Sequence, residues 1–413
     1  MLEVEFRRIV VNTPYAASRT IMTSLALIEK MTLPDDGFSG TLAARVWRPD
    51  VGGPSVVAVR ADGVFDVSAR FPTMYDLCEQ PSPAEALHAA RGPRLGLLAE
   101  ILANTPRDAR SADRPRLLAP VDLHALKTAG VTFAQSLMER VIEERAHGRR
   151  ESADAARLAI TDALGGELSA LKPGSPAAMR LKKALVEAGA WSLYLEVGIG
   201  PDAEVFTKGQ PMSAVGCGDD AGFHSASQWN NPEPEVALVV DSNGRIVGAT
   251  LANDVNLRDF EGRSALLLGK AKDQNASCAL GPFLRFFDAT FSLDEVRSSI
   301  VSLRVEGEDG FLMEGVSSMG KISRDPADLV AQTLGASHAY PDGLVLLLGT
   351  MFAPVADRGA PGMGFTHKTG DIVRIGAEKL GQLVNRMRPC EECERWSFGT
   401  AALMRNLARR GLI

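Results

Sequence analysis

The half of the chain that follows Trp191 is built from short apolar runs separated by turn-forming residues. The runs have strand length, and Gly, Asp, Asn or Pro closes each of them: VALVVD, IVGATLA, VSLRVEG, LVLLLGT and DIVRIG. Val- and Ile-rich runs of this length predict β-strands. We therefore expect residues 191–395 to form one β-dominated domain within a chain of the α+β class.

The part of the chain before Trp191 predicts smaller units. Apolar residues alternate around turns from Thr41 to about Val67, and a helical patch follows over Ala84 to Leu102. Helical spacing over Leu123–Ala146 and Ala153–Leu171 predicts two helices, which would connect this part of the chain to the β-rich domain. The expected division is a dispensable extension (1–30), a small mixed domain (31–115), the helical connector (116–190), the β-rich domain (191–395) and a C-terminal helix (396–413).

The charge and the hydropathy of the chain limit the kinds of partner that it can bind. The net charge of −6 and the pI near 5.7 argue against a polyanion such as nucleic acid. No run reaches the roughly 18 uninterrupted apolar residues of a membrane span, and the broken apolar run after Arg7 and Arg8 is poor for a secretory signal. We expect a cytoplasmic protein that binds small molecules and copies of itself.

Cysteine usage gives no sign of a disulfide framework, because the count of five is odd and the residues are scattered. Cys390 and Cys393 form a C-x-x-C pair. A zinc site needs a second such pair or two histidines, and the sequence offers none nearby. We interpret the pair as two reduced thiols.

Two carboxylates stand at the mouth of an apolar strand in NNPEPEVALVVDSNG. Glu233 and Glu235 are two residues apart, so their side chains project from the same face of the strand. Their repulsion raises one pKa unless a cation lies between them. The pair therefore indicates a hard-metal site or an acid/base couple, and an exposed strand face is the remaining alternative.

A third carboxylate ends the next apolar run, RIVGATLAND. The turn text DSNG predicts a hairpin, which would bring Asp254 beside Glu233 and Glu235. Three oxygen ligands without His or Cys suit Mg²⁺, Mn²⁺ or Ca²⁺ better than Zn²⁺. Such a site leaves positions open for water and for a bidentate substrate.

Lys270 and Lys272 follow in GKAKDQNASCALGPF. A lysine beside a metal-bound keto acid would neutralise a carboxylate or an enolate, or would deliver a proton if burial lowered its pKa. The spacing alone does not choose between these two residues.

The order of these residues resembles the fumarylacetoacetate hydrolase superfamily over about residues 190–390. The shared elements are E-x-E, N-D-x-x-x-R-D, K, L-G-P, L-G-T and G-D-I-V-R-I; here they are Glu233 and Glu235; Asn253, Asp254, Arg258 and Asp259; Lys272; Gly281 and Pro282; Gly349 and Thr350; Gly370 and Asp371. The segments AEVFTKGQPMSAVG, GTMFAP and GFTHKTGD are most similar to those of 2-keto-3-deoxy-pentonate dehydratases.

The resemblance implies a β-roll-like catalytic domain, a homo-oligomer (dimer or tetramer) and a small 2-keto acid as substrate. It implies that Mg²⁺ assists dehydration of a 2-keto-3-deoxy-pentonate to 2-oxoglutarate semialdehyde through a stabilised enolate. The implied roles are Glu233, Glu235 and Asp254 for the metal; Glu204 as acid/base and Lys272 on the substrate; Thr350, Thr132, Phe133 and Ser136 along the substrate; and Arg258 paired with Asp259 to orient Asp254. Thr350 equally suits a turn cap, and Phe133 equally suits the core.

Two other functions stay open from the sequence. A carbon–carbon hydrolase or decarboxylase of a β-diketo or acylpyruvate-type acid would use the same fold and metal. Hydrolases of the superfamily resemble one another in a His/Glu pair that activates water, and His124 with Glu139 or Glu143 is the candidate pair here. A catalytically silent binding protein would typically lack a metal ligand or the lysine, whereas this chain has them all.

Overall fold

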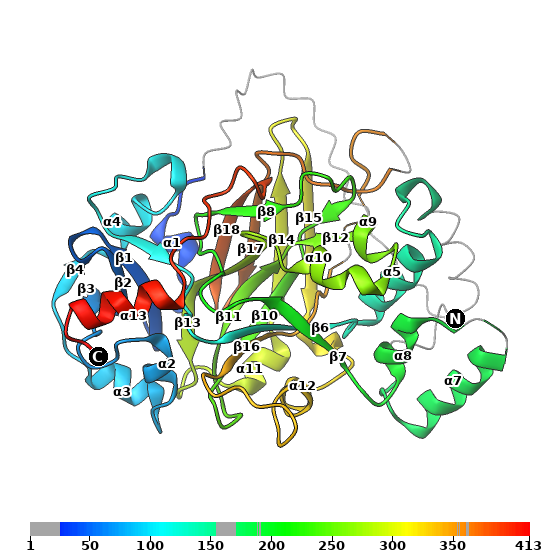
Figure 1. Cartoon of the computed structure of the whole chain (residues 1–413), viewed down its shortest axis with the longest axis horizontal. Helices are drawn as coiled ribbons and strands as arrows, with labels where there is room; N and C mark the ends of the chain where they lie inside the picture. The colour runs from blue at the N-terminus through cyan, green and yellow to red at the C-terminus, as the bar shows by residue number, and fades with distance from the viewer. Residues whose placement is uncertain are drawn as a thin grey trace.

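Two β-sheets of unequal size form the centre of the molecule (Figure 1). The structure is a computed structural model that describes residues 25–153, 171–187, 189, 191–352, 354, 356–360 and 363–413. The larger sheet runs in the order β4 (Arg94–Gly96), β3 (Gly63–Asp66), β2 (Gly53–Arg60), β1 (Leu42–Arg48), β13 (Cys278–Phe286), β11 (Ile246–Asp254), β10 (Pro234–Val240), β16 (Leu344–Leu347), β6 (Ala125–Gly130) and β7 (Glu204–Gly209), with β5 (Arg116–Leu118) paired to β1.

The smaller sheet packs against the larger one. Its order is β15 (Leu312–Ser318), β14 (Ile300–Glu306), β17 (Ile372–Ala377), β18 (Gly381–Pro389) and β8 (Asp220–Phe223). A separate two-stranded pair joins β9 (Asn230–Asn231) to β12 (Asn256–Leu257). The α+β, β-rich class that the sequence predicts is confirmed.

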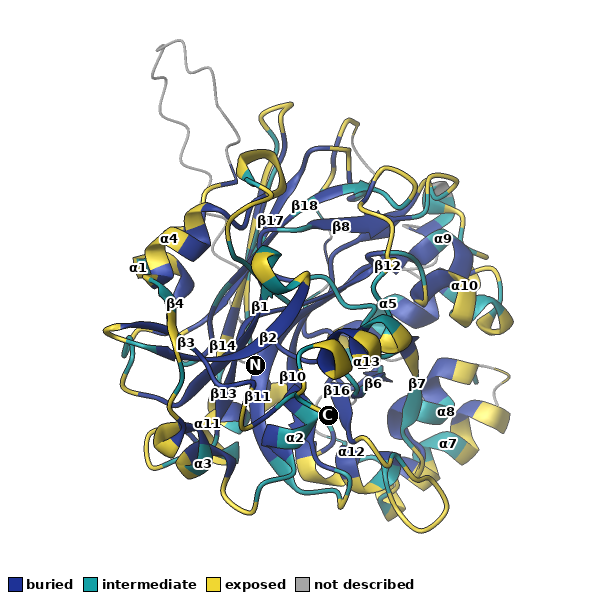
Figure 2. Ribbon diagram, turned by 60° about the vertical axis from the view of Figure 1, so that its left-hand side comes forward, coloured by how far each residue is buried: buried dark blue, intermediate teal, exposed yellow. Residues whose placement is uncertain are grey.

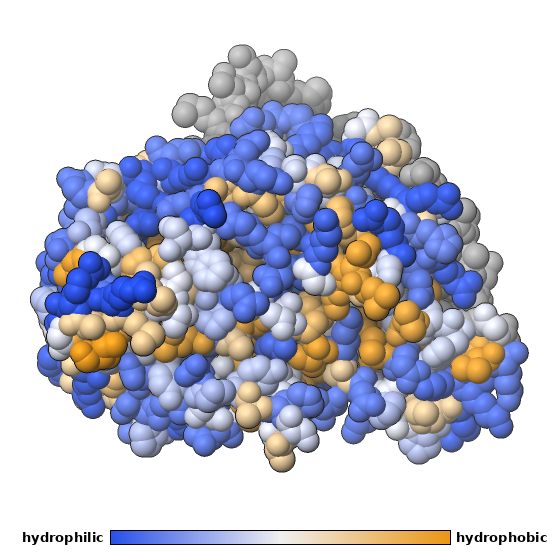
Figure 3. Space-filling model, in the orientation of Figure 1, coloured by the Kyte–Doolittle hydropathy of each residue, from blue (hydrophilic) through white to orange (hydrophobic). Residues whose placement is uncertain are grey.

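Short helices cover the outside of the sheets, and their outward faces are exposed while the central strands are buried (Figure 2). The described α-helices are α1 (Glu29–Thr32), α2 (Met74–Cys78), α3 (Pro83–Ala89), α4 (Leu98–Ala103), α5 (Ala134–Arg145), α7 (Pro176–Glu187), α8 (Leu193–Ile199), α9 (Arg258–Glu261), α10 (Leu268–Lys272), α11 (Leu293–Ser298), α12 (Pro326–Thr333) and α13 (Thr400–Arg409). None of these helices is long and apolar enough to cross a membrane. The face in Figure 3 is mainly hydrophilic, with apolar residues gathered right of centre.

The hydrophobic core lies on both faces of the central strands. Along β10, Val236 and Leu238 belong to the core between the two sheets, whereas Ala237 and Val239 belong to the core on the opposite face. A strand that is buried on both faces reads as a continuous apolar run, which is the pattern VALVV. This double burial fixes the register of β10, because a slip of one residue would exchange its two faces.

The N-terminal strands continue the sheet of the C-terminal half, because β1 pairs with β13 in an antiparallel register. The last helix, α13, packs on the same region: Asn406 Nδ2 donates to Val51 O at 2.8 Å. The domain boundaries proposed from the sequence remain predictions, and residues 1–24 of the expected extension lie outside the described residues.

One expected helix differs from the structure. Helical spacing predicts a helix over Leu123–Ala146, but Ala125–Gly130 forms strand β6 and only Ala134–Arg145 is helical. Strand β6 lies between β16, with which it is parallel, and β7. Pairing on both sides outweighs the weak helical preference of ALKTAG. Most of the second expected helix, at 154–170, lies outside the described residues.

Candidate metal centre and active site

Three buried carboxylates meet where β10 begins and β11 ends. The hairpin register sets Glu235 opposite Ala252, and the backbone N–H of Asp254 donates to Glu233 O at 3.0 Å. Glu233, Glu235 and Asp254 each offer an oxygen within 4.8 Å of the others, and none is more than 3% exposed. The grouping that strand parity and the hairpin turn predict is present.

Glu235 is the member of the cluster with an unsatisfied oxygen. Its Oε2 accepts a hydrogen bond from Gly349 N at 2.7 Å, whereas its Oε1 is buried without a hydrogen-bond partner in the described part of the chain. Burial, together with the charges of Asp254 and Glu233, raises the pKa of Glu235 well above its ordinary value. A hard divalent cation would satisfy the open oxygen and neutralise the repulsion, so the donor set fits Mg²⁺.

Two buried lysines hold the other two carboxylates. Lys272 Nζ lies 2.6 Å from Glu233 Oε2 and 3.0 Å from Asp254 Oδ2, and Lys208 Nζ lies 2.7 Å from Asp254 Oδ1. Burial alone would lower the pKa of Lys272, but the charges of Asp254 and Glu233 outweigh it and raise the pKa. Lys272 is therefore a permanent cation at neutral pH, which favours charge neutralisation over proton delivery.

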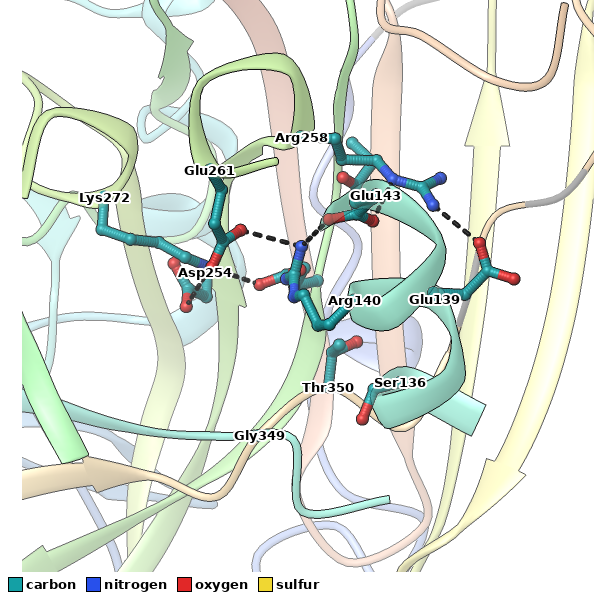
Figure 4. Close-up of polar contacts among 12 residues, drawn as sticks. Ser136, Glu139, Arg140, Glu143, Asp254, Arg258, Glu261, Lys272, Gly349 and Thr350 are labelled. Carbon is teal, nitrogen blue, oxygen red and sulfur yellow. Dashed lines mark hydrogen bonds and ion pairs between the residues drawn. The ribbon is translucent and has the colours of Figure 1, made fainter. Parts of the chain in front are cut away.

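Arg140 connects this cluster to helix α5. Its guanidinium contacts Glu233, donates to Glu143 at 2.7 Å and lies 2.8 Å from Glu261 (Figure 4). The salt bridges remove one oxygen of Glu233 from other partners and hold α5 against α9. Burial raises the pKa of Glu261 to about 7, although the positive charge of Arg140 opposes this increase.

Arg258 extends the network away from the carboxylate cluster. It donates to Glu143 at 2.6 Å and to Glu139 at 2.7 Å, and its guanidinium lies 4.4 Å from the centre of the Trp229 ring. The pairing of Arg258 with Asp259 that the sequence predicts is not formed. Asp259 instead accepts from the hydroxyl of Ser227 at 2.7 Å, because adjacent helical residues point in different directions.

Glu204 begins strand β7, opposite Gly130 of β6. Its pKa is raised by burial, an effect that the charges of Arg140 and Lys272 reduce. The side chain lies so close to Gly130 that a Cβ there would stand 1.9 Å from Glu204 Oε2. A half-buried carboxyl with a raised pKa, next to the charged cluster, has the properties of an acid/base group.

The residues predicted to contact substrate divide into two groups. Ser136 and Thr350 line a small pocket together with Glu233 and Arg140, and Figure 4 shows the two hydroxyl residues near one another. Neither of the others lines this pocket: Thr132 Oγ1 donates to Leu348 O at 2.6 Å, and Phe133 is 3% exposed within the hydrophobic core.

Thr132 contributes to the site indirectly, through the backbone of Gly349. Its φ of +93° is unfavourable for residues with a side chain, and a Cβ at this position would lie 2.1 Å from Thr132 Oγ1. The glycine N–H that holds Glu235 therefore depends on an unusual backbone conformation, which Thr132 helps to fix.

The His/Glu pair of the alternative hydrolase function is not formed. His124 is completely buried near Asp122, 4.0 Å away, just before the start of β6, while Glu204 lies opposite the end of that strand. Glu139 and Glu143 bind Arg258 instead.

Three residues at the site are absent from the sequence-based prediction: Arg140, Lys208 and Glu261. Lys208 could have been found, because it lies four residues after Glu204 and so shares its face of β7. Arg140 follows Ser136 by four residues on one face of α5, which is a weaker signal. Glu261 has no local signal, since its position depends on how α9 packs.

Comparison with known proteins shows what this β-rich fold with its buried carboxylate cluster is similar to. Residues 200–388 match the family model described as fumarylacetoacetate (FAA) hydrolase C-terminal. This part of the chain is similar to that family, and the match covers less than half of the chain.

Two curated relatives match about half of this chain. The 2-dehydro-3-deoxy-D-arabinonate dehydratase of Saccharolobus solfataricus is 32% identical over 200 residues, which are 48% of this chain and 62% of the relative. The probable 2-keto-3-deoxyxylonate dehydratase of Haloferax volcanii is 29% identical over 199 residues, 48% of this chain and 65% of the relative. The matched regions thus span less than two thirds of either relative.

Solved structures share the fold. A 2-keto-3-deoxy-D-arabinonate dehydratase in its apo form has a TM-score of 0.59 and 21% identity, covering 84% of this chain and 99% of the other. A structure of that enzyme complexed with magnesium and 2,5-dioxopentanoate has a TM-score of 0.58, 21% identity and the same coverage.

Proposed function

We propose that this protein is a Mg²⁺-dependent hydro-lyase that converts a 2-keto-3-deoxy-pentonate into 2,5-dioxopentanoate, which is 2-oxoglutarate semialdehyde. The observation that carries the proposal is the buried cluster of Glu233, Glu235 and Asp254, with a free oxygen on Glu235 and Glu204 nearby. The names of the two curated relatives and of the magnesium complex support the same reaction.

The three carboxylates would hold the cation, and Mn²⁺ or Ca²⁺ would suit the same oxygen ligands. When bound, Mg²⁺ would polarise the 2-keto group of the substrate and stabilise the negative charge that develops as a C3 proton leaves. The rest of the chemistry falls to protein side chains. Lys272 keeps its positive charge beside Glu233 and Asp254, and so it would also balance the charge of the substrate carboxylate.

Glu204 is our candidate for the proton transfer. As a carboxylate it would take a proton from C3, and as an acid it would donate that proton to the C4 hydroxyl, which leaves as water. Loss of water leaves a C3–C4 double bond conjugated with the 2-keto group. Removal of a proton from C5 and protonation at C3 then give the C4–C5 enol, which tautomerises to the C5 aldehyde. A raised pKa suits both halves of this cycle, because the group must bind and release a proton near neutral pH.

The pocket residues would fix the substrate. Thr350 follows Gly349, whose N–H binds Glu235, so its hydroxyl is our candidate ligand for the substrate carboxylate. Ser136 would bind the hydroxyl end. For Thr132 and Phe133 we propose supporting roles: Thr132 fixes the backbone at Leu348, and Phe133 anchors the start of α5 in the core.

Carbon–carbon hydrolysis is the second candidate function, because the fold and the cluster would serve it equally. It requires a base that activates water, and the described residues offer no histidine partnered with Glu139 or Glu143. This observation favours the dehydratase. We further propose a cytoplasmic homo-oligomer, a dimer or tetramer, which light scattering of the purified protein would test.

Proton NMR of a reaction mixture tests the function. The protein is incubated with Mg²⁺ and either 2-keto-3-deoxy-D-arabinonate or its C4 epimer, and a parallel sample receives an acylpyruvate. The proposal expects 2,5-dioxopentanoate from at least one pentonate and its loss when EDTA is added. Cleavage of the acylpyruvate with both pentonates intact would refute dehydration and favour the hydrolase.

A further inference from the structure

We propose that a second pocket of this protein binds a small planar organic anion. The pocket lies between strands β1 and β5, the turn that follows β7, and residues 394–398 before α13. Its volume is about 320 Å³, which is within the range of small-molecule sites. None of the predicted metal ligands lines it, and neither does Glu204, so it is distinct from the candidate active site.

The acidic residues in the pocket wall are already neutralised. Asp220 lies 2.5 Å from Arg107, and Asp219 lies 2.5 Å from Arg110. Glu394 is paired with Arg110 as well, at 3.2 Å. These acids are thus paired with other arginines, and Arg45 is paired with Asp122 at 3.6 Å, so that Arg116 is a pocket cation that these ion pairs do not include.

Arg116 is the cation that lacks an anion. It projects from β5 with its guanidinium 5.3 Å from the centre of the Trp47 ring, and its Nε is buried without a hydrogen-bond partner. No hydrogen bond or ion pair joins its side chain to another residue in the described ranges. Leaving such a donor buried and unpaired is costly, and a carboxylate or phosphate in the pocket would satisfy it.

Arg45 supplies a second donor from the floor of the pocket, where it is 4% exposed. Its Nη1 donates to Val121 O at 2.6 Å, but the hydrogen bond of Nη2 goes to the sulfur of Met212 at 3.5 Å. Sulfur is a weak acceptor. An oxygen of the ligand would therefore improve the contacts of Nη2 as well.

Aromatic side chains complete the pocket and suggest the planar part of the ligand. Phe398 meets Trp47 edge to face with ring centres 5.2 Å apart, and Trp396 is 42% exposed at the rim. Aromatic faces bind flat rings by stacking, and an arginine stacked on an aromatic ring directs its N–H groups outward in the plane of its own guanidinium. A carboxylate or phosphate on a flat ring would engage both features.

Calorimetric titration of the full chain with naphthalene-2-carboxylate and with naphthalene-2-carboxamide tests the proposal. The acid should bind at least tenfold more tightly than the neutral amide, because only the acid supplies an anion to Arg116. 2-Naphthyl phosphate is titrated in parallel. Tighter binding of the phosphate would identify phosphate as the preferred anion, and tighter binding of the acid would identify carboxylate.

Two variants locate the site. Arg116→Gln should weaken binding of the acid about tenfold, whereas Arg114→Gln, an exposed arginine two residues away, should leave it unchanged. Trp396→Leu, at the partly exposed rim, should also weaken it and offers a test that does not disturb β5. Equal binding of acid and amide, or an affinity for the acid that neither Arg116→Gln nor Trp396→Leu changes, would overturn the proposal.

Discussion

Replacing Glu235 by Gln should have opposite effects on stability with and without a divalent cation. The acidic oxygens of the cluster lie within 4.8 Å of one another. At an effective dielectric constant of about 20, two unit charges 4.8 Å apart repel by roughly 3.5 kcal/mol. Glu235 faces two such charges, and Lys272 offsets part of the repulsion. We expect Glu235→Gln to stabilise the metal-free protein by about 2 kcal/mol.

The pH dependence of this gain follows from the raised pKa of Glu235. A carboxyl whose pKa is higher in the folded than in the unfolded state contributes stability below its unfolded pKa, and that contribution is lost as the pH rises through the folded pKa. Gln does not titrate. The advantage of the variant should therefore be largest above neutral pH and should shrink toward pH 5.

A divalent cation should reverse the order of stability of the wild type and the Glu235→Gln variant. Mg²⁺ at about one hundred times its dissociation constant would stabilise the wild type by about 2.7 kcal/mol, and the variant, which lacks one ligand, should gain much less. Urea unfolding in EDTA and in Mg²⁺ measures both effects, with the exposed Glu85→Gln as control. A variant that is less stable than the wild type in EDTA, or equally stabilised by Mg²⁺, would refute the reasoning.

Two further predictions concern Glu204. Gly130→Ala should lower kcat about 100-fold by displacing the Glu204 carboxyl. The control, Gly269→Ala, should leave kcat unchanged, because a Cβ there meets nothing within 4 Å. Steady-state assays compare the two variants, and equal kcat values would contradict the placement of Glu204. If the ionised form of Glu204 takes the C3 proton, kcat should rise with pH through a pKa above the usual glutamate value. A Glu204→Gln variant whose kcat still rises with pH in this way would exclude Glu204 as the base.

The carboxylate cluster could be predicted from the sequence because its geometry is local. Strand parity puts Glu233 and Glu235 on one face, and a short hairpin returns the chain to place Asp254 beside them. Side chains that arrive from distant segments lack such a signal. Arg140 is 93 residues before Glu233, and it reaches the cluster only because α5 packs against α9.

The errors in the sequence-based predictions have the same origin. The segment Ala125–Gly130 has helical spacing, yet it pairs with β16, which lies more than 200 residues later in the chain. The resemblance implies a pair between the adjacent residues Arg258 and Asp259, but their positions on helix α9 direct them to different partners. Local pattern identifies elements and nearby ligands, and long-range pairing decides the remainder.

The claim on which this account depends is that Glu233, Glu235 and Asp254 form a single divalent metal site. Electron paramagnetic resonance of free Mn²⁺, followed as protein is titrated in, measures this directly. The account predicts one bound Mn²⁺ per chain, displaced by Mg²⁺ and lost in both Glu235→Gln and Asp254→Asn. Binding that persists unchanged in the two variants, or no binding to the wild type, would contradict it.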